Sequence, residues 1–204
     1  MRQEVRSERS RGALLDAALA LFSRQGYRAT SVRDIAGQAG TSTGSVYHHF
    51  RDKETIFQTL LDQFWAASSR PDFPLSRVFE EGAFPDDLPA IGLAAQETIT
   101  TWRPYIALIY VDVVEFEGRH IHRFYADLAQ RYQEFLERRT DLEIPSRVRE
   151  SIPPAVAMVL TTRIFVYYFV VEVLFGVPNH YGLSRDDATR LISDILTRGI
   201  LRQR

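Results

Sequence analysis

The side chains best suited to bind a charged partner lie together between residues 41 and 53. This stretch begins with hydroxyl groups around one glycine and ends with ring and ammonium donors: Thr41, Ser42, Thr43, Gly44, Ser45, Tyr47, His48, His49 and Lys53. Such groups bind phosphate oxygens and base edges, and a glycine lets the backbone approach them closely. The pattern therefore indicates recognition of a nucleic acid rather than cleavage of a bond.

Patterns typical of catalysis or metal binding are missing from the sequence. The chain has no cysteine, which excludes disulfides, cysteine-ligated zinc and thiol nucleophiles. On a helix, His48 and His49 would diverge by about 100°. His120 and His122 would point to nearly opposite faces, and we expect them at the solvated surface. We expect no enzyme, no catalytic or metal site and no cofactor.

Two short helices joined at Gly40 are predicted to position the polar stretch. Ser31 and Asp34 have the spacing of a capping box, which opens the first helix. Thr41 or Ser42 would cap the second helix, which runs to His49. A short turn of this kind favours a helix-turn-helix over residues 31–50, with the helix of residues 42–49 reading the major groove.

Helical spacing of apolar residues extends over most of the chain. It recurs over residues 13–25, 53–64, 91–101, 104–117, 120–139, 154–175 and 186–201. The four prolines of residues 70–90 predict a loop, with at most a helical turn near 76–81. We predict an all-α fold of about nine helices. A three-helix domain that contains the helix-turn-helix would span residues 8–68, and an antiparallel helical domain would span 85–204.

Charge is distributed unevenly along this chain. Residues 1–55 carry nine basic and six acidic side chains, whereas the remainder has a net charge of −4. This asymmetry is typical of a basic binding domain on an acidic body, although a difference of this size also arises by chance. Four early arginines could follow a DNA groove as an arm or belong to a solvated tail: Arg2, Arg6, Arg9 and Arg11.

Two features bear on the cellular compartment. The first residues lack the apolar stretch of a secretion signal, so we expect a cytoplasmic protein. Residues 155–175 are long and apolar enough to cross a bilayer, but Arg163 and Glu172 lie inside them. Charged side chains are costly in hydrocarbon, so the pattern favours a buried helix of a soluble protein.

Residues 10–65 closely resemble the N-terminal DNA-binding region of the TetR family of bacterial transcriptional regulators. The matching elements are the apolar helix ending at Phe22, then Gly26-Tyr27, Thr30-Ser31-Val32, Asp34-Ile35-Ala36, Ala39-Gly40, Gly44-Ser45-Val46-Tyr47-His48-His49-Phe50, and Lys53-Glu54 with Phe57. Residues 70–204 carry no motif that matches. The resemblance implies a regulator, most simply a repressor released from a palindromic operator by a small-molecule effector.

The resemblance also implies which residues contact DNA. These are Ser31 and Arg33 from the first helix, Thr43, Gly44, Ser45, Tyr47, His48 and His49 from the reading helix, and Lys53 beyond it. The reading helix lacks arginine, lysine, asparagine and glutamine, which are the usual bidentate readers of bases. We therefore predict modest direct readout and a contribution from DNA shape. The ring of Tyr47 could pack on the core while its hydroxyl meets a phosphate.

The C-terminal half is expected to hold a dimer interface and a ligand pocket. By resemblance, the helices of residues 154–175 and 186–201 form a four-helix interface through Phe165, Phe169, Val173, Leu191 and Ile195; a wholly internal helix is the alternative. The candidates for the pocket are Trp102, Tyr105, Tyr110, Asp112, Glu115, Phe116, Phe124, Phe165, Tyr168 and Phe169. The helix of residues 105–117 would pivot at Pro104 and Gly118. Control by a partner protein, or activation in place of repression, remain alternatives.

Overall fold

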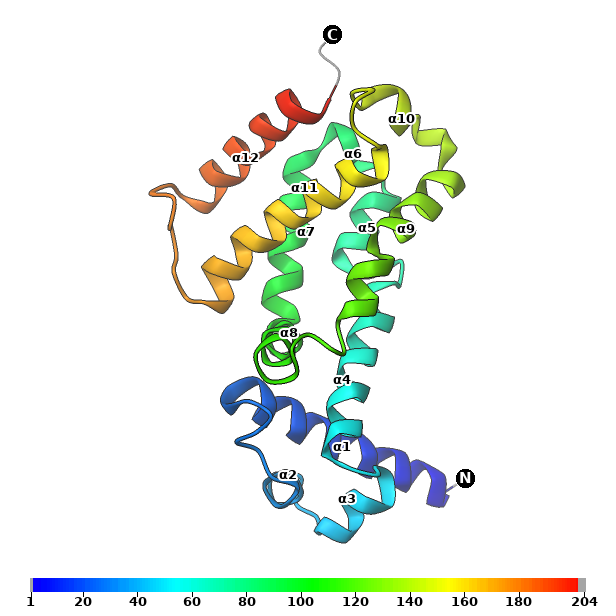
Figure 1. Ribbon diagram of the computed structural model, residues 1–204, viewed down its shortest axis with the longest axis vertical. Coiled ribbons are helices and arrows are strands. Elements are labelled where there is room, and N and C mark those ends of the chain that lie inside the picture. The colour runs from blue at the N-terminus through cyan, green and yellow to red at the C-terminus, as the bar shows by residue number, and fades with distance from the viewer. Residues whose placement is uncertain (1, 202–204) are drawn as a thin grey trace. The chain divides into compact units, whose positions relative to one another are not determined.

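The computed structural model describes residues 2–201, and side chains from residue 5 onward, as a chain of α-helices (Figure 1). The helices are α1 (Arg2–Gln25), α2 (Val32–Gln38), α3 (Thr43–His49), α4 (Lys53–Ser68), α5 (Pro74–Glu80), α6 (Ala83–Asp86), α7 (Leu88–Thr101), α8 (Arg103–Phe116), α9 (His122–Arg138), α10 (Ile144–Arg147), α11 (Pro154–Phe169) and α12 (Arg185–Ile200). The predicted all-α class is confirmed.

The number of helices exceeds the nine expected from the sequence, because three short helices occupy segments expected to be loops. These are α5, α6 and α10, of seven, four and four residues. Proline stands in the first turn of α5 and of α10, where its missing N–H costs no hydrogen bond. Proline in residues 70–90 therefore starts helices as well as interrupting them.

The chain divides into two compact units, and each unit combines two separate stretches of the sequence. The first unit contains the residues up to Ala67 together with Pro104–His122, and the second contains Ser68–Arg103 together with the residues from Arg123 onward. The chain first leaves the first unit after Ala67. Nearly all of α8 and the turn after it belong with the N-terminal helices.

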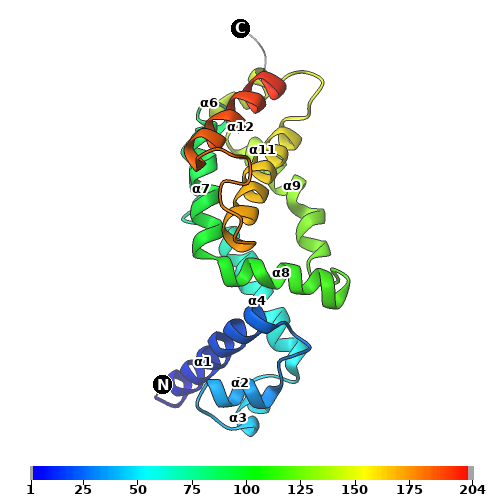
Figure 2. The ribbon, with the colours of Figure 1, turned by 90° about the vertical axis from the view of Figure 1, so that its left-hand side faces the viewer.

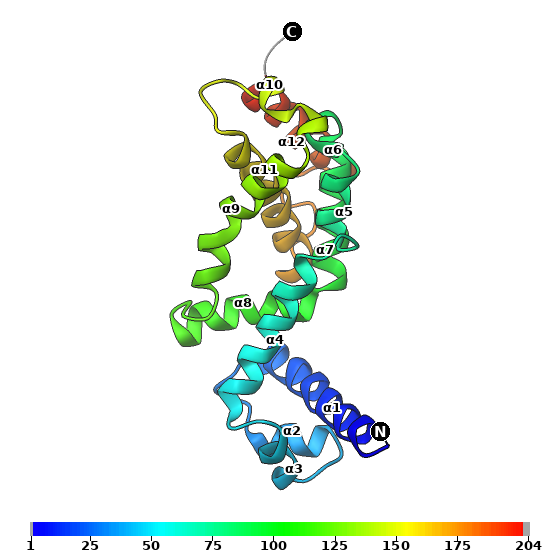
Figure 3. The same ribbon diagram turned by 90° about the vertical axis from the view of Figure 1, so that its right-hand side faces the viewer.

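The first unit is built around an apolar core shared by α1, α4 and α8. Phe22, Phe57 and Leu108 are fully buried in it. The ring of Tyr27 lies among those of Phe22, Phe57 and Phe116, with centroids 4.5–5.5 Å away. Figures 2 and 3 both show α2 and α3 on the opposite side of α1 from α8. The two short helices are thus carried at one end of this unit.

The second unit is centred on the contact of α7 with α11. A β-carbon at Gly92 of α7 would lie 3.0 Å from the ring of Phe165 and 2.7 Å from the methyl group of Thr189. The glycine therefore lets both α11 and α12 approach α7 closely. The stretch Pro154–Leu174 is long and apolar enough to cross a membrane, and half of its most apolar part is buried inside the protein.

Candidate nucleic-acid interface

Local capping signals fix where α2 and α3 begin. The Ser31 hydroxyl accepts a hydrogen bond from the backbone N–H of Asp34 at 3.1 Å, and the Asp34 carboxylate accepts one from the N–H of Ser31 at 2.8 Å. Ser42, rather than Thr41, caps α3 and accepts from the N–H of Ser45. Both helices therefore start where their hydroxyl residues satisfy free amides.

A four-residue break, residues 39–42, connects the two helices. Gly40 takes a left-handed conformation with φ +65°, which favours glycine, and Thr41 donates its N–H back to Ala36 at 2.9 Å. Val46 anchors α3 because its side chain is buried in the core of the first unit. The predicted helix-turn-helix over residues 31–50 thus has its expected geometry.

The predicted reading residues lie on the outer side of α3. Thr43, Gly44, Tyr47 and His48 are exposed, whereas Ser45 and His49 are half-buried. Tyr47 has 59% of its surface exposed, so its ring does not complete the core. Burial, followed by the charge of His48, lowers the pKa of His49. His49 is therefore uncharged near pH 7, with one ring nitrogen to donate and one to accept.

Helix α2, the first helix of the helix-turn-helix, offers a different kind of contact. Arg33 is exposed, so its guanidinium can reach a phosphate or a guanine. The Ser31 hydroxyl is committed to the cap of α2, with Asp34 at 2.6 Å. These bonds lower the pKa of Asp34, chiefly through the Ser31 hydroxyl and then the Ser31 amide.

Lys53 occupies a different place from the phosphate contact expected of it. Its Nζ donates to the carbonyl oxygens of Tyr27 and Thr30, both at 2.7 Å, and lies 3.9 Å from the centre of the Tyr27 ring. Burial lowers its pKa. Lys53 therefore connects the start of α4 to the loop of residues 26–30 through hydrogen bonds to two backbone carbonyls of that loop.

The basic N-terminal residues continue α1 instead of forming an extended arm. The helix begins at Arg2, and the exposed Arg6 and Arg9 project from it. Arg11 lies over the ring of Phe50 at 5.0 Å, which fixes its stem beside the end of α3. Arg6, Arg9 and Arg11 therefore place positive charge along the N-terminal half of α1.

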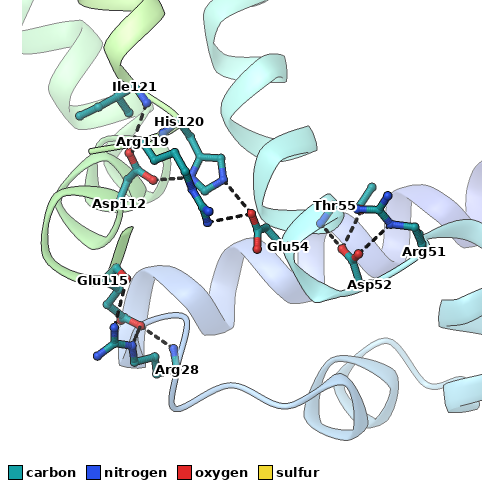
Figure 4. Close-up of polar contacts among 10 residues, drawn as sticks. All are labelled: Arg28, Arg51, Asp52, Glu54, Thr55, Asp112, Glu115, Arg119, His120 and Ile121. Carbon is teal, nitrogen blue, oxygen red and sulfur yellow. Dashed lines mark hydrogen bonds and ion pairs between the residues drawn. The ribbon is translucent and has the colours of Figure 1, made fainter. Parts of the chain in front are cut away.

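The two carboxylates of α8 that were expected in a ligand pocket are used inside the first unit (Figure 4). Asp112 is fully buried and accepts from the amides of His120 and Ile121, with His120 Nδ1 2.5 Å from its other oxygen. Glu115 accepts from the amides of Tyr27 and Arg28. Both side chains thus satisfy backbone groups instead of facing a ligand.

His120 corrects the expectation of a solvated imidazole. Its side chain is 7% exposed and lies between Asp112 and Glu54, with Nε2 3.4 Å from the Glu54 carboxylate, which also binds Arg119 at 2.9 Å. The expectation assumed that His120 lies on a helix, whereas it lies in the turn between α8 and α9. The signal for this contact in the sequence is indirect. Asp112 lies among apolar residues, and a carboxylate buried there needs a hydrogen-bond donor.

The other pocket candidates are divided between the two units. Tyr105, Tyr110 and Phe116 lie with α8 in the first unit, where Tyr105 stacks on Phe64 and Phe116 on Phe57. The remaining aromatic candidates belong to the second unit: Trp102, Phe124, Phe165, Tyr168 and Phe169. Phe165 and Phe169 are fully buried and Tyr168 nearly so. These three side chains serve the core of that unit.

The same burial changes the expected dimer surface. Phe165 and Phe169 are out of reach of a second subunit, and Val173 is half-buried. The exposed apolar side chains of α11 are on another face: Val156, Leu160, Ile164 and Tyr167. On α12, Leu191 and Ile195 are exposed as expected. Phe165 and Phe169 therefore lie on the inner face of α11, which the sequence did not distinguish from the exposed face because α11 is apolar nearly all round.

Comparison with known proteins agrees with this geometry. Residues 14–60 match the family model for bacterial regulatory proteins of the tetR family. The chain is 54% identical over 54 residues to the HTH-type transcriptional repressor KstR2 of Mycobacterium tuberculosis. That match covers 26% of this chain and 27% of KstR2, so it spans about a quarter of the relative's length. Residues 14–60 are thus similar to bacterial regulatory proteins of the tetR family.

Solved structures extend the likeness in fold to nearly the whole chain. A TetR-family regulator from Mesorhizobium loti covers 97% of this chain and 99% of its own, with a TM-score of 0.64 and 22% identity. NalD, the secondary repressor of the MexAB-OprM multidrug efflux pump in Pseudomonas aeruginosa, covers 97% of this chain and 100% of its own, with a TM-score of 0.62 and 22% identity. The helical C-terminal part thus has the architecture of TetR-family regulators.

Proposed function

We propose that this chain is a sequence-specific DNA-binding transcriptional repressor and not an enzyme, and that it acts in the cytoplasm. The observation that supports DNA binding is the exposed outer side of α3, held by a capped α2 and the buried Val46. The match to the tetR-family model, residues 14–60, includes α2 and α3. The proposed contacts are Arg33, Thr43, Gly44, Ser45, Tyr47, His48 and His49, with Ser31 contributing from the cap.

We propose further that the protein binds a palindromic operator as a homodimer. One reading helix of seven residues without strong base readers discriminates sequence poorly, so two copies are needed. The exposed side chains Val156, Leu160, Ile164 and Tyr167 recur at three and four positions along α11, and Leu191 and Ile195 do so on α12. Burying these two stripes against their symmetry mates would form a four-helix interface.

Release by a small-molecule effector completes the proposal. The relatives and neighbours are named as repressors and regulators, and NalD is named for the control of a multidrug efflux pump. An effector shifts the equilibrium only by the difference in its affinity for the DNA-bound and free forms of the dimer.

Footprinting on DNA that flanks the encoding gene tests the proposal. We expect protection of two half-sites related by two-fold symmetry, with centres about 34–36 Å apart. Tyr47→Ala should weaken binding, and Tyr47→Phe, which keeps the ring, separates the hydroxyl contact from packing. Protection without two-fold symmetry would contradict the dimer, and undiminished binding by Tyr47→Ala would contradict the proposed face.

A further inference from the structure

The loop of residues 26–30, between α1 and α2, is held by two oppositely charged side chains. Glu115 of α8 accepts the N–H of Tyr27 at Oε1, 3.0 Å away, and the N–H of Arg28 at Oε2, 2.6 Å away. Lys53 of α4 donates to the carbonyls of Tyr27 and Thr30, both at 2.7 Å. An anion thus satisfies the loop's donors, and a cation its acceptors.

The loop and the end of α8 also fit each other sterically. Gly26 has φ +85°, and a β-carbon there would lie 2.5 Å from Oε1 of Glu115. The Arg28 guanidinium in turn donates to the backbone oxygen of Glu115 at 3.3 Å, which caps the end of α8 (Figure 4). The carboxylate can approach the two amides because residue 26 has no side chain.

The backbone contacts matter more here than the ion pair. The Arg28 side chain is 78% exposed and its Nε lies 4.0 Å from Glu115, so solvent screens their attraction. Two hydrogen bonds from amides to a carboxylate that is 16% exposed are stronger. The role of Glu115 therefore depends on holding the backbone of residues 27 and 28.

The position of this loop determines the position of α2. The loop ends at Thr30, Ser31 caps α2, and α2 leads through Gly40 to the reading helix. The residues of α8 and its following turn, 104–122, are joined by peptide bonds at both ends to the second unit, at Arg103 and at Arg123. Through Glu115, together with the ring of Phe116 against Tyr27, this inserted segment holds the loop that leads into the helix-turn-helix.

We propose that Glu115 is a positioning residue for DNA recognition, through which α8 sets the loop of residues 26–30 and hence the helix-turn-helix. This inference rests on the proposed DNA-binding function. When the Glu115 contact is lost, the reading helix α3 stays folded. It is no longer held in the position and orientation that fit the major groove. Specific binding then falls, while sequence-independent attraction to phosphates persists.

The test compares Glu115→Gln with Glu117→Gln in the full chain. Both remove one negative charge near the end of α8, and Glu117 is exposed. Loss of a negative charge alone strengthens attraction to DNA slightly. We expect Glu115→Gln to weaken binding by about tenfold to a duplex that the wild-type protein selects from a random library. Binding to a mixed-sequence duplex should stay within about twofold.

Amide hydrogen exchange provides a readout that does not use DNA. We expect the amides of Tyr27 and Arg28 to exchange faster in Glu115→Gln and to be unchanged in Glu117→Gln. Amides in the middle of α1 and α4 should keep their protection. General acceleration in all four N-terminal helices would show that Glu115 only stabilises the fold, and would overturn the inference.

A double-mutant cycle with Lys53→Ala tests whether the two side chains act on the same loop. Once Glu115→Gln has released the loop, the loss of Lys53 should weaken specific binding less than it does in the wild-type background. The cycle of Lys53→Ala with Glu117→Gln should be additive within about twofold. Additivity in both cycles would overturn the inference. Failure of the wild-type protein to select any duplex would instead overturn the proposed function.

Discussion

At the scale of single residues, Lys53 shows how a charge close to a DNA-binding helix can serve the fold. Its ammonium is bound to two backbone oxygens and lies over the Tyr27 ring. Arg33, on α2, is exposed. The two cations are therefore expected to behave differently when they are removed.

We predict that Arg33→Ala makes the salt dependence of DNA binding shallower by about one unit in the slope of log K against log salt, as expected for a phosphate contact. Lys53→Ala should leave that slope unchanged and lower the thermal stability, because two carbonyls and a ring lose their cation. Fluorescence anisotropy over a salt series, with thermal melts, measures both. A shallower slope for Lys53→Ala would restore it as a phosphate ligand.

Asp52 caps α4 and supplies a prediction for acid stability. It accepts from the amide and hydroxyl of Thr55, and these bonds, with that from Arg51, lower its pKa to about 2. The stabilisation is present above the ordinary pKa of an aspartate and is lost as the pH falls towards 2.

The matched variants at this position are Asp52→Asn and Asp52→Ala. Near pH 7, Asp52→Ala should cost about 1 kcal/mol and Asp52→Asn less, since asparagine also caps helices. Urea denaturation at pH 7 and at pH 2.5 measures the difference. A cost of Asp52→Ala that is the same at both pH values would show that the ionised cap contributes nothing.

At the scale of elements, α9 and α11 are joined by a partly buried hydrogen bond. The Tyr132 hydroxyl lies 2.8 Å from the hydroxyl of Thr162, which also donates to the carbonyl of Met158. Burial raises the pKa of Tyr132 to about 12, and the bond to Thr162 opposes part of that rise. The neutral phenol is therefore the form that the folded protein keeps.

We predict that Tyr132→Phe costs about 1 kcal/mol of folding stability at pH 7. It should also remove part of the alkaline unfolding. In the wild type, the stabilisation is complete below pH 10 and is lost as the pH rises through about 12, where burial of the phenolate is penalised. Circular dichroism between pH 9 and 12.5 compares the two proteins. Coincident curves would show that Tyr132 ionises without strain.

The starts of helices could be predicted from sequence because their signals are local. Ser31 and Ser184 each accept the amide three residues ahead, as their spacing predicts. The partners of buried charges could not be predicted, because they come from distant segments. Glu115 binds an amide 88 residues earlier in the chain. A carboxylate in an apolar helix predicts only that some donor must reach it.

The buried face of α11 was equally beyond prediction from sequence. All its faces are apolar, and the choice among them depends on Gly92 of α7, which leaves room for Phe165. Phe165 and Leu160 look equivalent in sequence, yet one is fully buried and the other is exposed. Secondary structure therefore follows from local spacing, whereas the inner face follows from a partner helix.

At the scale of the whole molecule, the exposed stripes of α11 and α12 predict dimerisation. We expect Leu160→Glu to give a monomer and to weaken operator binding by about 100-fold, because the second half-site no longer binds intramolecularly. Leu93→Glu is the matched control, since Leu93 of α7 is exposed but lies outside both stripes. Analytical ultracentrifugation reports the mass. A dimer in Leu160→Glu would place the interface elsewhere.

The division of the chain into two units limits how this DNA-binding domain can be exchanged between proteins. A cut after Ala67 keeps α1 to α4 but discards Leu108 and Ile121 from their core, and with them the carboxylates of Asp112 and Glu115. A chimaera that joins residues 1–67 to another regulator's body must therefore supply an equivalent of residues 104–122. The residues that form and support the DNA-binding helices therefore come from two separate stretches of the sequence, up to residue 67 and 104–122. Recombination at a single crossover would separate these two stretches.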